Sequence, residues 1–305
     1  MSNWISYFFR YYFETKILNK KKPILAGYKI TYNCNLRCIH CPYWRKEHYE
    51  PKYQEALETI KKMYQRGARI LIFEGGEPLL WKDKELDKNI VDLINEAKKL
   101  YFSVGITTNG TLRLTDIPSD VIWVSFDGLK ETYNKVRGDF FDRVVKNIEE
   151  SNHENLYVNI TINKINAQEI EEMVKFISPL VKGITIQFHY PYGIQEDNEL
   201  FIPLGERKEI IDKLINLKKE GYPLADSYVC LESMKDNSWK CHDWMLVNAN
   251  PDGSITEGCY LKSRGEILCN SCGFAAHVEI SKAFDLSLSC INVGRKIFKY
   301  RQIAA

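Results

Sequence analysis

Three closely spaced cysteines constrain this 305-residue chain more than any other feature of its sequence. Cys34, Cys38 and Cys41 follow a strand-like run that ends at Thr31. Three thiolates this close together can hold three irons of a [4Fe-4S] cube and leave the fourth iron open to a small molecule. A structural metal site uses four protein ligands and closes itself, so three cysteines without a fourth indicate a catalytic site. The alternative is a zinc knuckle, although zinc sites usually pair two knuckles.

A glycine-rich motif, Glu74-Gly75-Gly76-Glu77-Pro78, follows the next strand-like run at residues 69–73. Glycines at such a position let backbone carbonyls approach a ligand that a side chain would block. Together the two motifs resemble the signature of radical S-adenosylmethionine (SAM) enzymes. In that family the open iron chelates the amino and carboxylate groups of SAM, and the glycine-rich loop binds its amino group. The resemblance implies that Gly75, Gly76, Glu77 and Pro78 bind SAM beside a [4Fe-4S] cluster.

Strand-like and helical patterns alternate along much of the chain. The strand-like runs, rich in Ile, Val, Phe and Tyr, lie at residues 27–31, 69–73, 102–108, 121–126, 156–162 and 183–189. Three apolar helical faces between them are Leu57, Ile60 and Tyr64, then Leu86, Ile90, Leu93 and Ala97, then Ile170, Val174 and Ile177. Six such units predict an α/β fold with a parallel sheet and outer helices. This pattern matches the partial (β/α)6 barrel of the radical SAM family, here over residues 27–221.

Polar side chains follow several of these strands, at the edge where parallel α/β sheets bind ligands. Asn109, Ser125 and Asn163 come at the ends of the third, fourth and fifth strands. The resemblance suggests that they hydrogen-bond the ribose or carboxylate of SAM, whereas polar residues at strand ends also cap turns. His40 stands where the family favours an aromatic side chain beside the adenine. We therefore expect the His40 imidazole to stack on the cofactor and not to ligate metal.

Charge and cysteine content narrow the class of protein. With 42 basic and 40 acidic residues the net charge is +2, so the chain lacks the electrostatic footprint of a nucleic-acid-binding protein. Nine cysteines, an odd number without a secretory signal, indicate a reducing cytoplasm in which thiols ligate metal. We therefore expect an oxygen-sensitive cytoplasmic protein with one main domain.

A cysteine-rich tail, residues 222–305, follows the last predicted helix. Within it, residues 250–254 form a turn signal between two strand-like stretches and predict a β-hairpin. The hairpin resembles the twitch or shortened SPASM extension of radical SAM proteins, which implies a second [4Fe-4S] cluster.

Four cysteines are the predicted ligands of this second site. Cys241 and Cys259 stand at the base of the hairpin, and Cys269 and Cys272 supply a knuckle. A four-cysteine zinc site is the alternative, because tetrahedral zinc accepts the same ligands. The remaining tail cysteines, Cys230 and Cys290, are either buried thiols or substitutes for one of the four.

The N-terminal segment, residues 1–26, has the pattern of an amphipathic helix. Its apolar face covers more than half of a helical wheel and consists of Trp4, Ile5, Phe8, Phe9, Tyr12 and Phe13. Five basic residues against one acidic residue in positions 1–22 favour contact with a membrane surface. The segment is too short and too polar to span a bilayer. The alternative is a helix that packs on the barrel as a cover.

The resemblance also implies the chemistry. In this family an electron cleaves SAM to methionine and a 5′-deoxyadenosyl radical, which abstracts hydrogen from unactivated carbon. The electron comes from a low-potential donor such as ferredoxin or flavodoxin. Because the cofactor supplies this reactivity, the protein contributes orientation and the exclusion of water.

Two short tail segments suggest a substrate. Residues 239–244 and 258–261, which contain Cys-x2-Trp and Cys-Tyr-Leu, are similar to hopanoid-adenosylating radical SAM proteins, which act on a membrane hydrocarbon. We therefore expect a lipid hydrocarbon chain as substrate, with carbon–carbon bond formation. Maturation of a ribosomally made peptide is the second hypothesis. The third is a non-enzymatic iron-sulfur or zinc scaffold that binds a partner.

Overall fold

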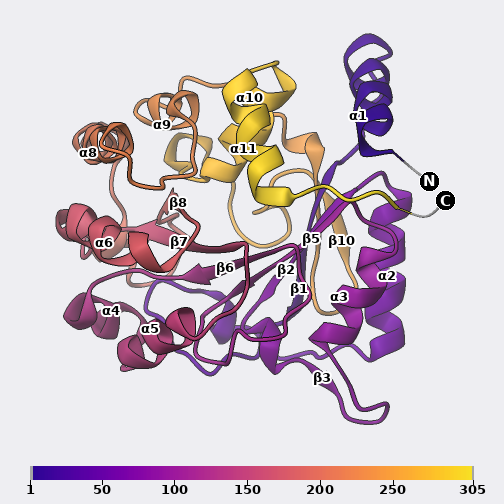
Figure 1. The fold of residues 1–305 in the computed structure, drawn as a ribbon, viewed down its shortest axis with the longest axis horizontal. Coiled ribbons are helices and arrows are strands. Elements are labelled where there is room, and N and C mark those ends of the chain that lie inside the picture. The colour runs from indigo at the N-terminus through magenta and orange to yellow at the C-terminus, as the bar shows by residue number, and fades with distance from the viewer. Residues whose placement is uncertain (1–2, 304–305) are drawn as a thin grey trace.

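A single eight-stranded sheet organises residues 3–303, the part of the chain that the computed structural model describes (Figure 1). Its strand order is β10-β9-β1-β2-β5-β6-β7-β8. Six consecutive strands of this order run parallel to one another: β1 (Leu25–Thr31), β2 (Ile70–Gly75), β5 (Ser103–Thr108), β6 (Val121–Ser125), β7 (Leu156–Ile162) and β8 (Gly183–Phe188). All six predicted strands are present, and the predicted partial (β/α)6 barrel is confirmed.

Helices cover the outer face of this sheet. They are α2 (Tyr53–Gln65), α3 (Ile90–Lys98), α4 (Lys130–Arg137), α5 (Phe141–Glu149), α6 (Ile170–Ile177) and α8 (Arg207–Lys219), with a short α7 (Asp197–Leu200). Two of the three predicted helical faces pack into the core as expected. The prediction for the face of α3 is confirmed at Ile90, Leu93 and Ala97, which are buried in the core, but Leu86 is about half exposed. Asn89 caps α3 through its side-chain oxygen, so Leu86 falls in the turn between β3 (Lys82–Asp83) and β4 (Lys88–Asn89).

Each barrel strand alternates between two environments. In β1, Ala26, Tyr28 and Ile30 belong to the main hydrophobic core, whereas Gly27 and Lys29 face the interior of the barrel. The other strands repeat this period of two, which is the spacing of side chains along a strand. As a result the outward side chains are apolar, and many of the inward ones are small or polar.

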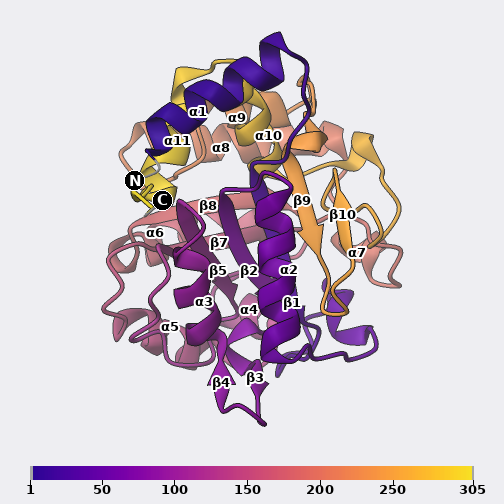
Figure 2. The same ribbon diagram turned by 90° about the vertical axis from the view of Figure 1, so that its right-hand side faces the viewer.

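The tail adds two strands to the edge of the barrel sheet. The predicted hairpin consists of β9 (Leu246–Ala249) and β10 (Ile255–Glu257), which pair antiparallel. In addition, β9 pairs in parallel with β1 from Leu25 to Tyr28. The hairpin is therefore continuous with the barrel, as Figure 2 shows. The expected domain boundaries at residues 26/27 and 221/222 stay predictions.

The last three helices, α9 (Tyr228–Met234), α10 (Ala275–Phe284) and α11 (Leu288–Phe298), follow in the tail. The Ser103 hydroxyl at the start of β5 donates a hydrogen bond to the Phe298 carbonyl (2.5 Å). Asn155, just before β7, donates to the Ile297 carbonyl (2.7 Å). The end of α11 thus lies against the first residues of the strands, at the opposite end from the predicted ligand-binding edge.

Helix α1 (Trp4–Tyr12) and the turn of helix at Phe13–Ile17 lie at the same end, across α11 and α10 (Figure 2). The Tyr7 hydroxyl donates to the Gly67 carbonyl (3.0 Å), and the Tyr7 ring packs on Phe102 with centroids 5.3 Å apart. The segment therefore packs on the fold, as the cover alternative expects. None of the helices formed by residues 3–303 combines the length and the apolar character that a membrane span requires.

Candidate active site

The three cysteines of the first motif gather in the loop after β1. Burial raises the pKa of Cys38 to about 12, while the neighbouring Arg137 guanidinium opposes the rise. Arg137 donates to Cys38 Sγ (3.8 Å), and the Asn109 amide donates to Cys34 Sγ (3.6 Å). Donors aimed at the sulfurs stabilise their thiolate form, which is the form that binds iron. The loop thus provides three adjacent thiols with supporting donors.

The glycine-rich loop lies directly against the cysteine loop. The Gly76 N–H donates to the Thr31 carbonyl (2.6 Å), and the Glu77 N–H donates to the Asn33 carbonyl (2.8 Å). A Cβ at Gly76 would stand 2.2 Å from the Asn33 carbonyl oxygen, so no other residue fits there. Gly75 and Gly76 line the cavity described below, whereas Glu77 and Pro78 are buried behind the loop.

Glu77 connects this loop to the end of β5. One carboxylate oxygen accepts hydrogen bonds from the Thr108 hydroxyl (2.8 Å) and the Leu79 N–H (3.1 Å), and the other accepts from the Asn109 N–H (2.7 Å). Burial raises the pKa of Glu77 to about 7, although all three donors favour the carboxylate. The hydrogen bonds of the Glu77 carboxylate therefore hold the glycine-rich loop against the end of β5.

The predicted polar residues at the strand ends have different surroundings. Asn109 and Ser125 line the cavity beside the cysteine loop. Asn163 is fully buried, and its side-chain oxygen accepts from the Ile165 N–H (2.9 Å), which is the turn-capping role that the sequence left open. His40 also lines the cavity, and burial lowers its pKa well below the usual value, so its ring is neutral. A neutral ring suits stacking on a cofactor.

Asp127 and Arg137 form a buried pair that the sequence analysis missed. The Arg137 Nε–H donates to Asp127 Oδ2 (2.7 Å), and Asp127 Oδ1 accepts from the Thr161 N–H (2.6 Å). The pair orients the guanidinium toward Cys38. Asp127 follows the end of β6 in a Ser-Phe-Asp-Gly segment, a signal that could have identified it, but nothing in the sequence near α4 singles out Arg137.

A second buried charge cluster crosses the barrel interior. Lys29 Nζ lies 3.1 Å from Glu74, and Arg264 from the tail lies 3.5 Å from the same carboxylate. The Lys29 ammonium also stands over the rings of Tyr43 (3.9 Å) and Tyr260 (4.8 Å). Burial lowers the pKa of Lys29 to about 8. A lysine inside an otherwise apolar strand was the sequence signal for this cluster.

One cavity of about 880 Å³ joins these features. It begins at the cysteine and glycine-rich loops, passes the inward side chains of the strands, and continues to the end covered by α1, α10 and α11. The part of the cavity beside the cysteine loop is polar. The part next to α1, α10 and α11 is mainly apolar and aromatic, and its lining residues include Trp4, Phe8, Ile72, Phe284, Ile297 and Phe298.

The four predicted tail ligands also gather. Burial raises the pKa of Cys241 to about 12, and Cys272, Cys259 and Cys269 add to the rise, so all four sulfurs are electrostatic neighbours. In a tetrahedral zinc site the sulfurs stand roughly 3.8 Å apart, given zinc–sulfur bonds of about 2.3 Å. Within residues 3–303 these sulfurs form no group of three within 4.8 Å of one another. Four neighbouring thiols are a donor set that either a [4Fe-4S] cube or a zinc ion would accept.

Residues 28–177 match the family described as the Radical SAM superfamily, and residues 184–286 match a domain of unknown function, DUF3463. The chain is a member of the radical SAM superfamily. The predicted enzyme class is thereby confirmed, and so is the expected cofactor pair of a [4Fe-4S] cluster with SAM.

Curated relatives have several different activities. The Fe-coproporphyrin III synthase of Methanosarcina barkeri is 26% identical over 275 residues, covering 78% of this chain and 66% of that protein. A GTP 3′,8-cyclase of Clostridium botulinum is 29% identical over 224 residues, covering 67% of this chain and 62% of the cyclase. The chain therefore spans about two thirds of the length of these relatives.

Solved structures share the fold. Streptococcus suis SuiB bound to SAM has a TM-score of 0.65 at 15% identity, covering 92% of this chain and 68% of SuiB. The protein anSMEcpe with bound AdoMet and a peptide has a TM-score of 0.59 at 18% identity, covering 91% and 82% of the two chains.

We predict that Gly76→Ala disrupts the active site without unfolding the chain. The added methyl group must push the glycine-rich loop away from Asn33, so SAM binding, measured by equilibrium dialysis on the anaerobically reconstituted protein, should be lost. Gly205→Ala is the matched control, because a Cβ there meets no atom within 4 Å. Unchanged SAM affinity in Gly76→Ala would show that the loop does not contact the cofactor.

We predict a second cluster that is independent of the first. A variant with Cys34, Cys38 and Cys41 all replaced by Ala should retain about four irons per chain, the content of one cube. Iron and zinc are measured together by elemental analysis. Zinc in place of iron would show that the tail holds the alternative four-cysteine zinc site.

Proposed function

We propose that this radical SAM enzyme acts on the hydrocarbon chain of a membrane lipid and forms a carbon–carbon bond. The cavity carries the proposal, because it leads from the cysteine loop into an apolar chamber beneath α1. When bound, the cluster and SAM supply a 5′-deoxyadenosyl radical that reacts with unactivated carbon. The protein must then hold an apolar chain beside that radical and keep water away.

The residues at the cysteine-loop end of the cavity fit the cofactor. Cys34, Cys38 and Cys41 would hold three irons, and the backbone of Gly75 and Gly76 stands open to the methionine part of SAM. Asn109 and Ser125 would hydrogen-bond the cofactor, and His40 would stack on the adenine. Glu77 and Asn163 would support these loops from behind.

The apolar part of the cavity, next to α1, α10 and α11, fits a hydrocarbon chain. Aromatic and aliphatic side chains from the N-terminal helix, the barrel and the tail helices form its wall. Binding of a hydrocarbon against an apolar wall displaces water and is favourable by roughly 25 cal/mol per Å² of apolar surface buried. Radical chemistry on a hydrocarbon requires no acid or base from this wall, because the cofactor supplies the reactivity.

The outer face of the N-terminal segment connects this chamber to a membrane surface. Ile5, Phe9, Phe13 and Ile17 recur every fourth residue and have exposed fractions of 44%, 75%, 53% and 64%. The opposite face, which includes Tyr7 and Tyr11, packs on the protein. Basic residues from 10 to 22 flank the exposed stripe. An exposed apolar stripe with basic flanks is typical of a helix that lies in the membrane interface.

The tail cysteines would serve as the electron entry. Cys241 and Cys269 are exposed, so a cluster held there would lie within reach of a ferredoxin or flavodoxin. Tyr260, which follows Cys259, packs against Lys29 inside the barrel. The tail site thus adjoins the wall of the cavity.

Peptide maturation is the second candidate. The cysteine-loop end of the cavity is made polar by the charge cluster of Lys29, Glu74 and Arg264, and a polar wall suits a peptide backbone better than a hydrocarbon. SuiB, which shares the fold, has been solved bound to a precursor peptide. The scaffold hypothesis is set aside because the chain belongs to an enzyme superfamily.

We predict that the reconstituted protein, reduced with dithionite, converts SAM to 5′-deoxyadenosine. Cys38→Ala should abolish this product because one iron loses its ligand, and chromatography with mass detection measures it. Retained tail iron and an unchanged circular dichroism spectrum show that the variant is folded. Equal activity in Cys38→Ala would contradict the assignment of the first cluster.

We predict that Phe9→Ser with Phe13→Ser weakens sedimentation with anionic liposomes by about 100-fold, since each buried phenylalanine contributes roughly 1.5 kcal/mol. SAM cleavage without substrate should persist, because both side chains are largely exposed and belong to the N-terminal segment, at the opposite end of the fold from the cysteine loop. Leu86→Ser is the matched control, because Leu86 is half exposed in the turn between β3 and β4. Figure 2 shows these two strands at the opposite end of the molecule from α1. Undiminished liposome binding would favour peptide maturation over the lipid hypothesis.

A further inference from the structure

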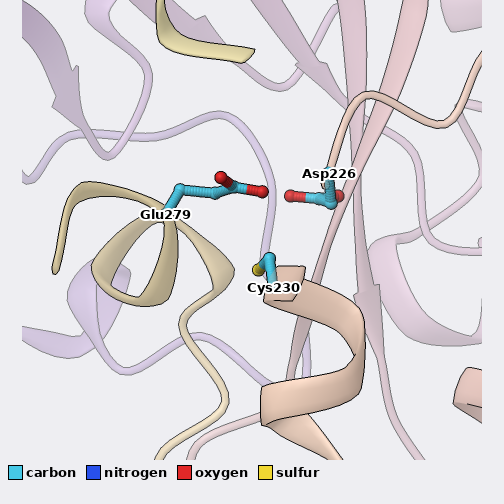
Figure 3. Close-up of side chains that lie close together, drawn as sticks. All are labelled: Asp226, Cys230 and Glu279. Carbon is cyan, nitrogen blue, oxygen red and sulfur yellow. The ribbon is translucent and has the colours of Figure 1, made fainter. Parts of the chain in front are cut away.

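The two cysteines left over from the tail site lie beside two carboxylates, those of the buried Asp226 and the partly buried Glu279. Asp226 precedes α9, Cys230 is in α9, and Glu279 is in α10 (Figure 3). One donor atom from each of these three residues lies within 4.8 Å of the other two. In residues 3–303 this is the one set of three or more His, Cys, Asp or Glu side chains gathered so tightly.

Both carboxylates are fixed in place by backbone donors. Asp226 is 4% exposed, and its Oδ2 accepts from the Ile186 N–H of β8 (2.8 Å). Glu279 Oε1 accepts from the Ser227 N–H (2.5 Å). Glu279 Oε2 is inaccessible to solvent and has no hydrogen-bond partner among the described residues. The two carboxylates point toward each other, as Figure 3 shows.

Neither carboxylate forms an ion pair within 4 Å among residues 3–303. The Lys218 ammonium is near enough to lower the pKa of Asp226, but it donates its hydrogen bond to the Leu224 carbonyl. Burial and the neighbouring Glu279 raise the pKa of Asp226 to about 7. Carboxylates in such surroundings persist when they are protonated, paired with a base or bound to metal, so without an ion pair the site holds either a shared proton or a metal ion.

The sulfurs identify the kind of cation. Cys230 is fully buried, and Cys290 Sγ lies 3.2 Å from the Ser227 hydroxyl oxygen. Burial is the main cause that raises the pKa of Cys290, and the nearby Glu279 adds to it. Thiolates do not suit Mg²⁺ or Ca²⁺, which take oxygen ligands, whereas Zn²⁺ accepts both sulfur and carboxylate oxygen.

We propose that Asp226, Cys230, Glu279 and Cys290 bind one zinc ion, separate from both iron-sulfur sites. Donor atoms around tetrahedral zinc stand roughly 3.3–3.8 Å apart, so the three clustered donors need to close by about 1.5 Å at most. Cys290, an electrostatic neighbour of Cys230 and Glu279, would supply the fourth ligand. Four protein ligands make the site structural. It would fasten α9, α10 and α11 to the β8 side of the barrel, where Asp226, Glu279 and Cys290 line the wall of the cavity.

The test measures zinc and iron in the anaerobically purified holoenzyme. We expect one zinc per chain in addition to the cluster iron. Asp226→Asn, Glu279→Gln and Cys290→Ser should each lower the zinc content by about tenfold or more while the iron content stays unchanged. Glu232→Gln is the matched control, because Glu232 lies on the exposed side of α9. Unchanged iron in each variant shows that the chain has folded.

A second measurement replaces zinc by cobalt. Co²⁺ added to the zinc-depleted protein should give a thiolate-to-cobalt absorption band that Cys230→Ser and Cys290→Ser weaken and Glu232→Gln retains. The proposal is overturned if the holoenzyme holds only cluster iron and takes up no Co²⁺, which would mean that the carboxylates share a proton. It is also overturned if zinc persists in Asp226→Asn with the cobalt band intact, because the zinc would then occupy the tail cysteines.

Discussion

The contact between the glycine-rich loop and the cysteine loop sets the geometry on which the active site depends. Gly76 and Glu77 each donate a backbone hydrogen bond into the first loop, at Thr31 and Asn33. The Glu77 carboxylate then joins both loops to the end of β5. Three neighbouring strands therefore end in one hydrogen-bonded unit. Because this unit is buried, the position of the cysteines follows from the register of the sheet.

The barrel interior divides the cavity into two environments. Where β1 and β2 approach the cysteine loop, Lys29 and Glu74 face inward, and Arg264 from the tail completes their ion cluster. Although burial raises the pKa of Glu74, Lys29 and Arg264 outweigh it and keep the carboxylate ionised. Toward α11, Trp123 and Ile297 form an apolar cluster instead. A substrate that reaches from one end to the other must match a polar region near the cofactor and an apolar region beyond it.

Much of the fold and part of the site could be predicted because their signals are local. The cysteine spacing, the glycine-rich motif and the alternation of strands and helices each occupy a short stretch of sequence. The error at Leu86 arose because this apolar residue continues the helical spacing backwards past Asn89, whereas Asn89 is the N-cap at which the helix begins.

Contacts between distant segments could not be predicted. Arg137 reaches Cys38, Arg264 reaches Glu74, and β9 pairs with β1, yet no pattern within either segment identifies its partner. The same limit applies to Cys230 and Cys290. Each resembles an ordinary buried thiol until the fold brings both beside Asp226 and Glu279.

The tail is an integral part of the cavity because the barrel alone leaves it open on two sides. β9 covers the edge of β1, and Tyr260 and Arg264 from the segment that follows the hairpin reach the charge cluster inside the barrel. The C-terminal helices close the far end, where the Phe298 and Ile297 carbonyls accept hydrogen bonds from the starts of two strands. α1 then packs over α10 through Tyr12 and Phe284. Side chains of α1 therefore complete the wall at the apolar end of the cavity.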